Sequence, residues 1–234
     1  MHFNIITLFP DFFKDPFNTS IIKKALEKRV ISIDLINLRD FTTYNHRQCD
    51  DKPYGGGHGM VLMIEPVYNA ITHIKKKHPD SKVIYLSPQG KVFNQEKAES
   101  FAKIKNITLL CGHYEGIDDR ILDDLVDEEI SIGDYILTGG ETASLVFMEV
   151  VSRLIPGVVQ KPQSVKTDSL SDGLLKYPQY TKPEEFKGSK VPEILLSGNH
   201  PKIKEWRKDQ QIEVTKKKRP DLYRKFIKRG NQSE

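Results

Sequence analysis

Three glycine-bearing segments in the middle of the chain carry residue types suited to ligand binding. They are Ser87-Pro88-Gln89-Gly90, residues 112–116 and residues 133–140. Each follows a short apolar run, and glycine lets the main chain approach a bound molecule closely. One such segment alone would be an ordinary turn after a strand. Three together favour a ligand site, because ligands of open α/β sheets bind at the carboxyl ends of the strands.

The sequence lacks two familiar phosphate-binding patterns. No segment has the three spaced glycines of a dinucleotide site, and no Gly-Lys-Ser/Thr closes a P-loop. The run from Gly55 to Gly59 follows a polar segment rather than a strand, so it is weak evidence for a nucleotide. The seven histidines and the two cysteines, Cys49 and Cys111, show no zinc-ligand spacing.

The elements that would position these segments alternate as in βαβ units, which predicts a mainly parallel sheet covered by helices. Apolar runs predict strands at 3–9, 30–35, 83–87, 107–111 and 130–137, the last one broken at Gly133. Apolar spacing and capping residues predict helices at 19–29, 66–77, 94–102, 118–126 and 141–155. A linker without periodicity follows at 158–167. A short helix at 168–176 and helical spacing beyond residue 199 are expected after it.

The charges are unevenly distributed along the chain. Its 234 residues carry a net charge of +4, but residues 200–230 carry +8 and the remainder −4. A basic end suggests a polyanionic partner, although a solvated helical face explains the same charges equally well.

The overall composition, with 38% hydrophobic and 29% charged residues, excludes a disordered chain. The sequence has neither a secretory signal nor an apolar run of the roughly 20 residues that span a bilayer. Its two cysteines suit a reducing compartment. We therefore expect a cytoplasmic protein.

Five longer motifs stand in register along the chain. They are DDKPYGGGHGM at 50–60, IYLSPQG at 84–90, CGHYEGID at 111–118, SIGDYIL with GGE at 131–141, and LLSGNH at 195–200. In this order they resemble the bacterial tRNA (guanine-N1)-methyltransferases, a family of the SPOUT methyltransferases. The resemblance extends from Phe9 to about Arg219 and is weakest at 160–167.

The resemblance implies an α/β fold with a knotted parallel sheet and a small C-terminal helical domain. The implied domains are a methyltransferase domain at 1–157, a flexible linker or lid at 158–176, and a helical tRNA-binding domain at 177–234. The family also implies a homodimer that uses S-adenosyl-L-methionine. By position, the cofactor-binding residues would be Tyr85, Leu86, Ser87, Pro88, Gly112, Tyr114, Glu115, Ile132, Gly133, Asp134, Tyr135, Ile136, Leu137, Gly139 and Gly140.

The family's reaction places a methyl group on N1 of guanosine 37, beside the anticodon of tRNA. Because N1 carries a proton at neutral pH, the reaction needs a base and a donor that stabilises charge on O6. Asp168 matches the family's base and Arg153 its arginine, while Glu115 would act near the methyl donor. A divalent ion, expected to be Mg²⁺, is also implied, but its ligands are unknown.

Each of these three residues also has an ordinary structural interpretation. Asp168 could cap a helix, Arg153 could complement the dipole at the end of a helix, and Glu115 could belong to a solvated acidic run. The resemblance favours a catalytic role over these interpretations. The spacing of the residues alone would not.

tRNA contacts are expected at two places. The loop residues Asp50, Lys52, Tyr54 and Gly59 would meet the extracted guanosine, or else form a structural loop at the dimer contact. Near the C-terminus, the residues expected to contact the anticodon stem-loop are Ser197, Asn199, His200, Arg207 and Lys208. We expect neither a DNA nor a membrane partner. The alternatives are a SPOUT methyltransferase for another RNA nucleotide and a non-catalytic RNA-binding protein.

Overall fold

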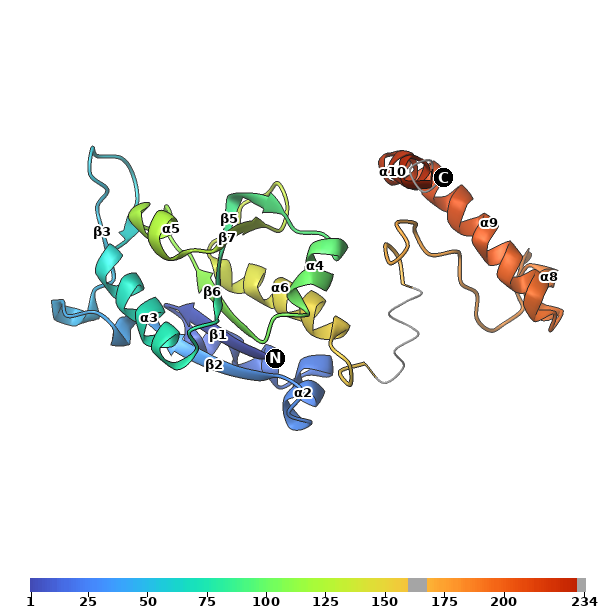
Figure 1. Cartoon of the computed structure of the whole chain (residues 1–234). Helices are drawn as coiled ribbons and strands as arrows, with labels where there is room; N and C mark the ends of the chain where they lie inside the picture. The colour runs from blue at the N-terminus through green and yellow to red at the C-terminus, as the bar shows by residue number, and fades with distance from the viewer. Residues whose placement is uncertain (160–167, 231–234) are drawn as a thin grey trace. The chain divides into compact units, whose positions relative to one another are not determined.

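The computed structural model describes residues 1–159 and 168–230 (Figure 1). The chain divides into two compact units, Met1–Gln160 and Lys161–Glu234, and each is described here by itself. The boundary falls within the expected linker at 158–176, of which residues 160–167 lie outside the described residues. None of the described helices combines the length and apolar character needed to cross a bilayer.

The first unit is built on a sheet of five parallel strands, as the sequence predicted. They are β1 (His2–Thr7), β2 (Ser32–Asn37), β5 (Lys82–Val92), β6 (Asn106–Cys111) and β7 (Glu128–Ser131). Their order across the sheet is β2-β1-β6-β5-β7, and all four neighbouring pairs run parallel. The two strands that precede the first two glycine-bearing segments, β5 and β6, therefore lie side by side.

Helices cover both faces of this sheet and make a three-layer unit (Figure 1). Along β6, Ile107 and Leu109 point to one face and Leu110 to the other, and all three are fully buried. The first face packs on α2 (Ser20–Glu27), α4 (Gln95–Phe101) and α6 (Gly140–Leu154). The second packs on α3 (Ile64–Lys77) and α5 (Arg120–Leu125).

Shorter elements connect these layers. They are the 3-10 turns η1 (Pro10–Phe13), η2 (Leu38–Asp40) and η3 (Asn45–Arg47), the helix α1 (Lys14–Phe17), and the antiparallel pair β3 (Asp50–Asp51) and β4 (Val61–Leu62). The glycine-rich segment found in the sequence is the loop between β3 and β4.

The predicted helices of this unit are confirmed, with ends that shift by a few residues. The Asn94 side chain caps α4 by accepting a hydrogen bond from the Lys97 main-chain nitrogen at 2.9 Å. Helix α3 begins at Ile64, two residues before Pro66, so the proline lies in its first turn, where its missing N–H costs nothing.

Two predicted strand ends are wrong. β5 does not stop at Ser87 but continues to Val92, because residues 87–90 bulge out between Leu86 and Lys91, which both pair with Ile130. The strand expected at 130–137 ends at Ser131, where the Ser131 hydroxyl accepts a hydrogen bond from the Gly133 nitrogen at 3.1 Å and turns the chain. The residues that follow form a loop.

The second unit consists of a small hairpin and helices. The hairpin pairs β8 (Glu185–Phe186) with β9 (Ser189–Lys190), and the helices are α8 (Glu193–Leu196), α9 (His200–Lys218) and α10 (Pro220–Gly230). The predicted helical character beyond residue 199 is confirmed, and the Asn199 side chain caps α9.

The helix expected at 168–176 is wrong, because this segment forms turns. Leu170 and Gly173 have φ angles of 75° and 83°, in the left-handed region, which an α-helix cannot contain. The Ser171 hydroxyl donates to the Asp168 carbonyl oxygen at 2.7 Å and stabilises the turn instead.

Candidate functional site

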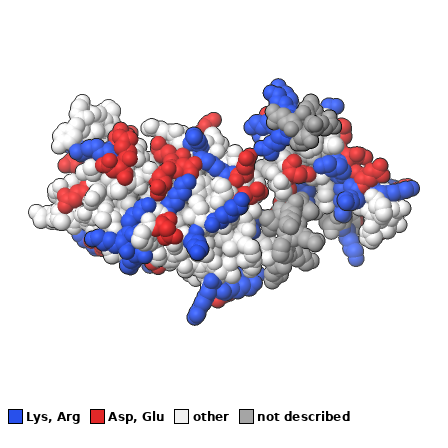
Figure 2. All heavy atoms as spheres, in the orientation of Figure 1, with Lys and Arg blue, Asp and Glu red and all other residues white. Residues whose placement is uncertain are grey.

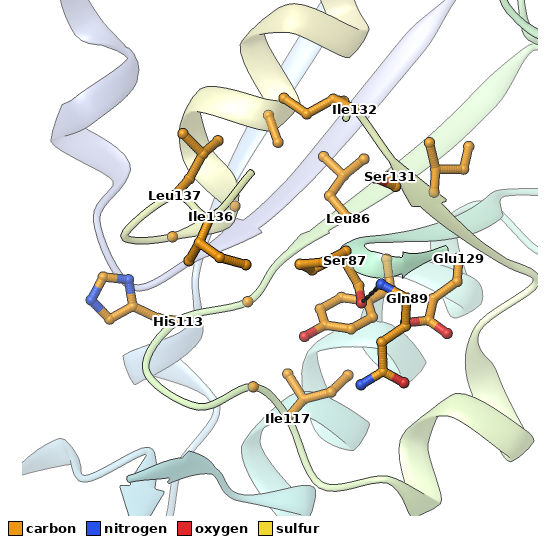
Figure 3. Close-up of a pocket in the computed structure, with 18 of the residues that line it drawn as sticks. Leu86, Ser87, Gln89, His113, Ile117, Glu129, Ser131, Ile132, Ile136 and Leu137 are labelled. Carbon is orange, nitrogen blue, oxygen red and sulfur yellow. Dashed lines mark hydrogen bonds between the residues drawn. The ribbon is translucent and has the colours of Figure 1, made fainter. Parts of the chain in front are cut away.

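A cavity of about 390 Å³ lies beside the bulge of β5 and at the ends of β6 and β7 (Figure 3). The three glycine-bearing segments of the sequence, 87–90, 112–116 and 133–140, all contribute to its lining. Its volume falls within the roughly 300–1,000 Å³ of typical small-molecule sites. The carboxyl edge of the sheet thus brings together segments that are up to 53 residues apart in the sequence, from Ser87 to Gly140.

Nearly all residues expected to bind a cofactor line this cavity. Those that do are Tyr85, Leu86, Ser87, Pro88, Gly112, Tyr114, Glu115, Ile132, Gly133, Tyr135, Ile136, Leu137, Gly139 and Gly140. Asp134 does not contribute to the lining, although both of its neighbours do.

The cavity also has lining residues that were not among those expected to bind the cofactor. They are Gln89, His113, Gly116, Ile117, Asp119, Leu122, Glu129, Ile130, Ser131, Thr138 and Ala143. Most of them stand within or beside the quoted motifs, so the motifs were a usable signal. Leu122 and Glu129 had no such signal, because α5 and β7 reach the cavity only through the packing of the sheet.

The cavity differs in chemistry between its two ends (Figure 3). Leu86, Ile132 and Leu137 make one end apolar, whereas Gln89 and Glu129 make the other polar. Glu129 Oε1 is buried and has no hydrogen-bond partner among the described residues. A buried carboxylate oxygen of this kind favours a ligand that brings a donor or a positive charge.

Close main-chain contacts hold two of the cavity loops together. The Gly140 nitrogen donates to the Gly112 carbonyl oxygen at 2.8 Å, and His113 forms a bridge with Gly139. A Cβ atom at Gly140 would lie 2.7 Å from the Cys111 Cα, and one at Gly139 would lie 2.5 Å from His113 Nδ1. Glycine is therefore required at Gly140, where the obstacle is main chain, whereas a side chain at Gly139 would force the His113 and Glu141 side chains to shift.

A buried hydrogen bond between β1 and the first turn of α6 lies next to these loops. Glu141 is only 5% exposed and accepts a hydrogen bond from the Thr7 hydroxyl at 2.7 Å. Burial, together with the nearby Glu141, raises the pKa of the Cys111 thiol far above its usual range. Cys111 therefore stays protonated and acts as a small packing residue rather than as a nucleophile.

The β3–β4 loop is attached to the cavity through its second half. The Glu115 nitrogen donates to the Met60 carbonyl oxygen, and the Leu62 nitrogen to that of Gly116, both at 3.0 Å. A Cβ atom at Gly59 would lie 2.6 Å from Glu115 Oε1. The structure thus brings Gly59, expected to contact RNA, against Glu115, expected to be catalytic.

The first half of the same loop carries the other expected RNA contacts. Asp50 lies in β3 and pairs with Leu62, whereas Lys52 and Tyr54 are exposed. The side chain of Tyr54 is fully accessible to solvent.

Arg153 and Asp168, the other two expected catalytic residues, belong to different units. Arg153 is exposed in the last turn of α6. Asp168 is half-buried in the second unit, where its Oδ1 atom lies 3.2 Å from Lys176 Nζ. The described residues contain no group of three or more His, Cys, Asp or Glu side chains that could hold a metal ion.

The expected RNA contacts of the second unit lie on or beside α9. Ser197 and Asn199 lie between α8 and α9, and His200 is the first residue of α9. The Arg207 guanidinium lies 4.9 Å from the centre of the Tyr177 ring, and Lys208 Nζ lies 3.3 Å from Asp172 Oδ2. Both side chains thus have partners within their own unit and are exposed as well.

The charges separate between the units as the sequence indicated. Both signs of charge occur on each unit, but acidic side chains gather over α5 and the start of β7, and basic ones outnumber acidic ones over α9 and α10 (Figure 2). All twelve Lys and Arg residues between 200 and 230 are exposed. A surface of this sign is suited to a polyanion.

The fold and the cavity define an α/β protein with a small-molecule site at the carboxyl edge of a parallel sheet, accompanied by a basic helical unit. Residues 1–225 match the family model of tRNA (guanine-1)-methyltransferase TrmD. The chain belongs to this family and is an enzyme of its class, which confirms the resemblance carried by the five motifs. As a methyltransferase of tRNA, it uses S-adenosyl-L-methionine as its methyl donor.

Proteins named tRNA (guanine-N(1)-)-methyltransferase are similar to nearly the whole chain. That of Clostridioides difficile is 51% identical over 227 residues, which cover 96% of this chain and 98% of the relative. That of Caldanaerobacter subterraneus is 52% identical over 225 residues, covering 96% and 92%. That of Carboxydothermus hydrogenoformans is 54% identical over 222 residues, covering 95% and 87%.

Tyr85 gives this site a testable dependence on pH. Burial, and then the nearby carboxylate of Glu129, raises the pKa of Tyr85 to about 12. An unfolded tyrosine ionises near pH 10, so the folded chain holds this proton more tightly. The resulting stability is fully present below about pH 10 and is lost as the pH rises from about 10 to about 12. Over that range, wild type should lose roughly 2–3 kcal/mol more unfolding free energy than Tyr85→Phe.

Denaturant unfolding at a series of alkaline pH values measures this difference. Tyr68→Phe, which removes the hydroxyl of an exposed tyrosine, is the matched control and should follow wild type. Parallel curves for wild type and Tyr85→Phe would contradict the burial of this phenol.

Proposed function

We propose that the chain methylates N1 of guanosine 37 in tRNA, with S-adenosyl-L-methionine bound in the cavity at the carboxyl edge of the sheet. The observation that carries this proposal is the cavity itself, because it is lined by three of the motifs through which the chain resembles its family. In a parallel sheet this edge is where ligands bind.

The residues of the cavity fit the proposed donor. Leu86, Ile132 and Leu137 offer an apolar slot for an aromatic base, and the neighbouring main chain offers hydrogen bonds. The buried Oε1 of Glu129 favours a positively charged or hydrogen-donating ligand. When bound, S-adenosyl-L-methionine supplies an electrophilic methyl group on a sulfonium centre.

Asp168 is proposed as the general base and Arg153 as its partner at the guanine. The Asp168 carboxylate would accept the N1 proton, which frees the nitrogen lone pair for methyl transfer. The charge that develops on O6 would be stabilised by the fixed donors of the Arg153 guanidinium. Glu115, which lines the cavity beside Gly59, would orient the reacting groups. Mg²⁺ remains a proposal from the family alone, since the described residues offer no cluster of ligands for it.

We also propose that the carboxyl edge is knotted. In support, the chain returns after the edge strand β7 across the ends of β5 and β6. At the start of α6, the Gly140 nitrogen then donates a hydrogen bond to the Gly112 carbonyl oxygen, and the rest of α6 packs on the sheet. The limits proposed for the domains remain 1–157, 158–176 and 177–234.

The catalytic assignment predicts that Asp168→Asn lowers methyl transfer to a tRNA transcript by roughly 10²- to 10⁴-fold, because a general base is removed. Arg153→Lys keeps the charge but loses the planar fork of donors, and should also lower the rate. Donor binding, measured by calorimetry, should persist in both variants. Asp209→Asn, which changes an exposed aspartate on α9, is the control and should retain activity. Full activity of Asp168→Asn would refute its role as base.

The basic surface of α9 and α10 is proposed to bind the anticodon stem-loop of tRNA. Lys216, Lys217 and Lys218 lie exposed at the C-terminal end of α9. Contacts of such side chains with phosphates release counterions, which makes binding dependent on salt and largely independent of sequence.

The triple variant Lys216→Gln, Lys217→Gln and Lys218→Gln should therefore bind tRNA more weakly. The slope of log K against log salt should become shallower by roughly 0.7–0.9 for each phosphate that these lysines neutralise in the wild type. Filter binding across a salt series measures this slope. Replacing Lys23, Lys24 and Lys28 of the first unit by Gln removes the same charge and should leave the slope unchanged. Equal slopes in the two triple variants would contradict the assignment.

We propose that the enzyme is a homodimer. In support, the first unit exposes several large apolar side chains near the cavity, among them Phe9, Tyr114 and Ile136. The ring of Phe9 lies 5.0 Å from that of His113, which lies 4.6 Å from that of Tyr114. An exposed group of aromatic and apolar side chains of this kind is typical of a protein contact, and a second copy is its proposed occupant.

Sedimentation equilibrium should accordingly give twice the chain mass of 26.9 kDa for the wild type. Phe9→Asp places a charge on this surface and should shift the protein towards monomer. Phe186→Asp makes the same change at an exposed aromatic residue of the second unit and should remain dimeric. A monomeric wild type would overturn the proposal.

A further inference from the structure

Asp168 stands at the head of a compact turn that is closed by its own hydrogen bonds. The Asp168 carbonyl oxygen accepts from the Ser171 hydroxyl at 2.7 Å, and the Leu170 nitrogen donates to the Leu174 carbonyl oxygen at 2.7 Å. At the other end, the Lys176 nitrogen donates to the Ser169 hydroxyl at 2.9 Å, and Lys176 Nζ contacts the Asp168 carboxylate. These contacts tie residues 168–176 to one another, and we call this segment the base turn.

The base turn is attached to α9 through a buried hydroxyl group. The Leu175 nitrogen donates to Thr215 Oγ1 at 2.8 Å, and the same hydroxyl donates to the Gln211 carbonyl oxygen at 2.6 Å. The Thr215 hydroxyl thus acts both as an acceptor and as a donor. Thr215 and the neighbouring Leu174 are fully buried, so water does not replace the bond.

Two exposed contacts add to this attachment. Asp172 Oδ2 accepts from Lys208 Nζ at 3.3 Å, and Tyr177, next to the base turn, packs under Arg207. Exposed pairs of this kind are weak and can exchange partners with a polyanion. The buried bond at Thr215 is then what fixes the turn while the basic side chains bind RNA. Thr215 immediately precedes Lys216, the first of three exposed lysines.

We propose that Thr215 is a positioning residue for the reaction: its hydroxyl group sets the position of Asp168 relative to α9, the helix that carries tRNA-binding charges. The proposal rests on the proposed role of Asp168 as base. It adds that tRNA bound to α9 and the carboxylate that acts on its guanine are linked through one buried side chain. Removing this link should impair proton removal without impairing RNA binding.

Two matched substitutions at residue 215 test this proposal. Thr215→Val keeps the shape of the side chain but removes the hydroxyl, and should lower kcat by roughly ten- to hundredfold, as small misplacements of reacting groups do. The Kd for tRNA and the Kd for S-adenosyl-L-methionine should stay unchanged. Thr215→Ser keeps the hydroxyl and should restore most of kcat. Unchanged kcat in Thr215→Val, or failure of Thr215→Ser to restore it, would overturn the proposal.

A double-mutant cycle separates positioning from a general loss of structure. If Thr215 acts through Asp168, adding Thr215→Val to Asp168→Asn should lower the residual single-turnover rate by less than about twofold. A merely structural effect would lower the rate equally in both backgrounds and would refute positioning. The cycle also distinguishes the two proposals, because full activity of Asp168→Asn alone would refute the base, whereas additive effects would refute only Thr215.

A second variant keeps the test valid if Thr215→Val unfolds, which circular dichroism would reveal. Thr215→Ala also removes the hydroxyl that accepts the hydrogen bond of the Leu175 nitrogen, without adding a branched apolar side chain, and then takes its place. It should lower kcat in the wild-type background and not in the Asp168→Asn background. Equal effects in both backgrounds would count against coupling of the base turn to α9.

Discussion

The close approach of two main-chain segments at Gly112 and Gly140 is the constraint on which the site depends. Their hydrogen bond of 2.8 Å places the first residue of α6 directly against the end of β6. Any side chain at Gly140 would meet the main chain of Cys111, which cannot yield as a flexible side chain would. Helix α6 can therefore lie across the sheet with Phe147 and Val151 fully buried only because glycine stands at its first position. The same contact brings the loop 133–139 over the carboxyl edge, which creates the cavity.

Two carboxylates near the cavity of the first unit, those of Glu141 and Glu129, differ in their surroundings. Glu141 is buried in the first turn of α6, where the helix dipole favours a negative charge and Thr7 supplies a donor. Its carboxylate is thus accommodated as a structural group. Glu129 has no such compensation on Oε1 among the described residues, although it lies at the cavity wall. Two carboxylates close to one site thus differ in kind. The buried Glu141 stabilises the loops, whereas the half-buried Glu129 has one buried oxygen atom that finds no donor among the described residues and so favours a positively charged or donating ligand.

The sequence predicted the elements whose signals are local and missed those decided by tertiary contact. Asn94 indicated α4, and the apolar run at 107–111 indicated β6, since capping and burial act within a few residues. The strand predicted at 83–87 stops before Pro88, yet β5 continues because a bulge accommodates the proline, which no local rule reveals. The loop after Ser131 has the pattern of a strand because Ile136 and Leu137 are apolar. They line a cavity rather than a core, and only the neighbouring loops decide that.

The second unit shows why net charge alone could not assign the roles of its basic residues. Arg207 and Lys208 were expected as phosphate contacts, but in the folded unit they also pack on Tyr177 and pair with Asp172. Long basic side chains can do both, because the stem packs while the charged head stays in water. Lys216, Lys217 and Lys218 differ, since they follow the buried Thr215 at the helix end, where the dipole favours cations. Within one helix, Arg207 and Lys208 thus contact residues of their own unit, whereas Lys216, Lys217 and Lys218 are the cations proposed to bind RNA.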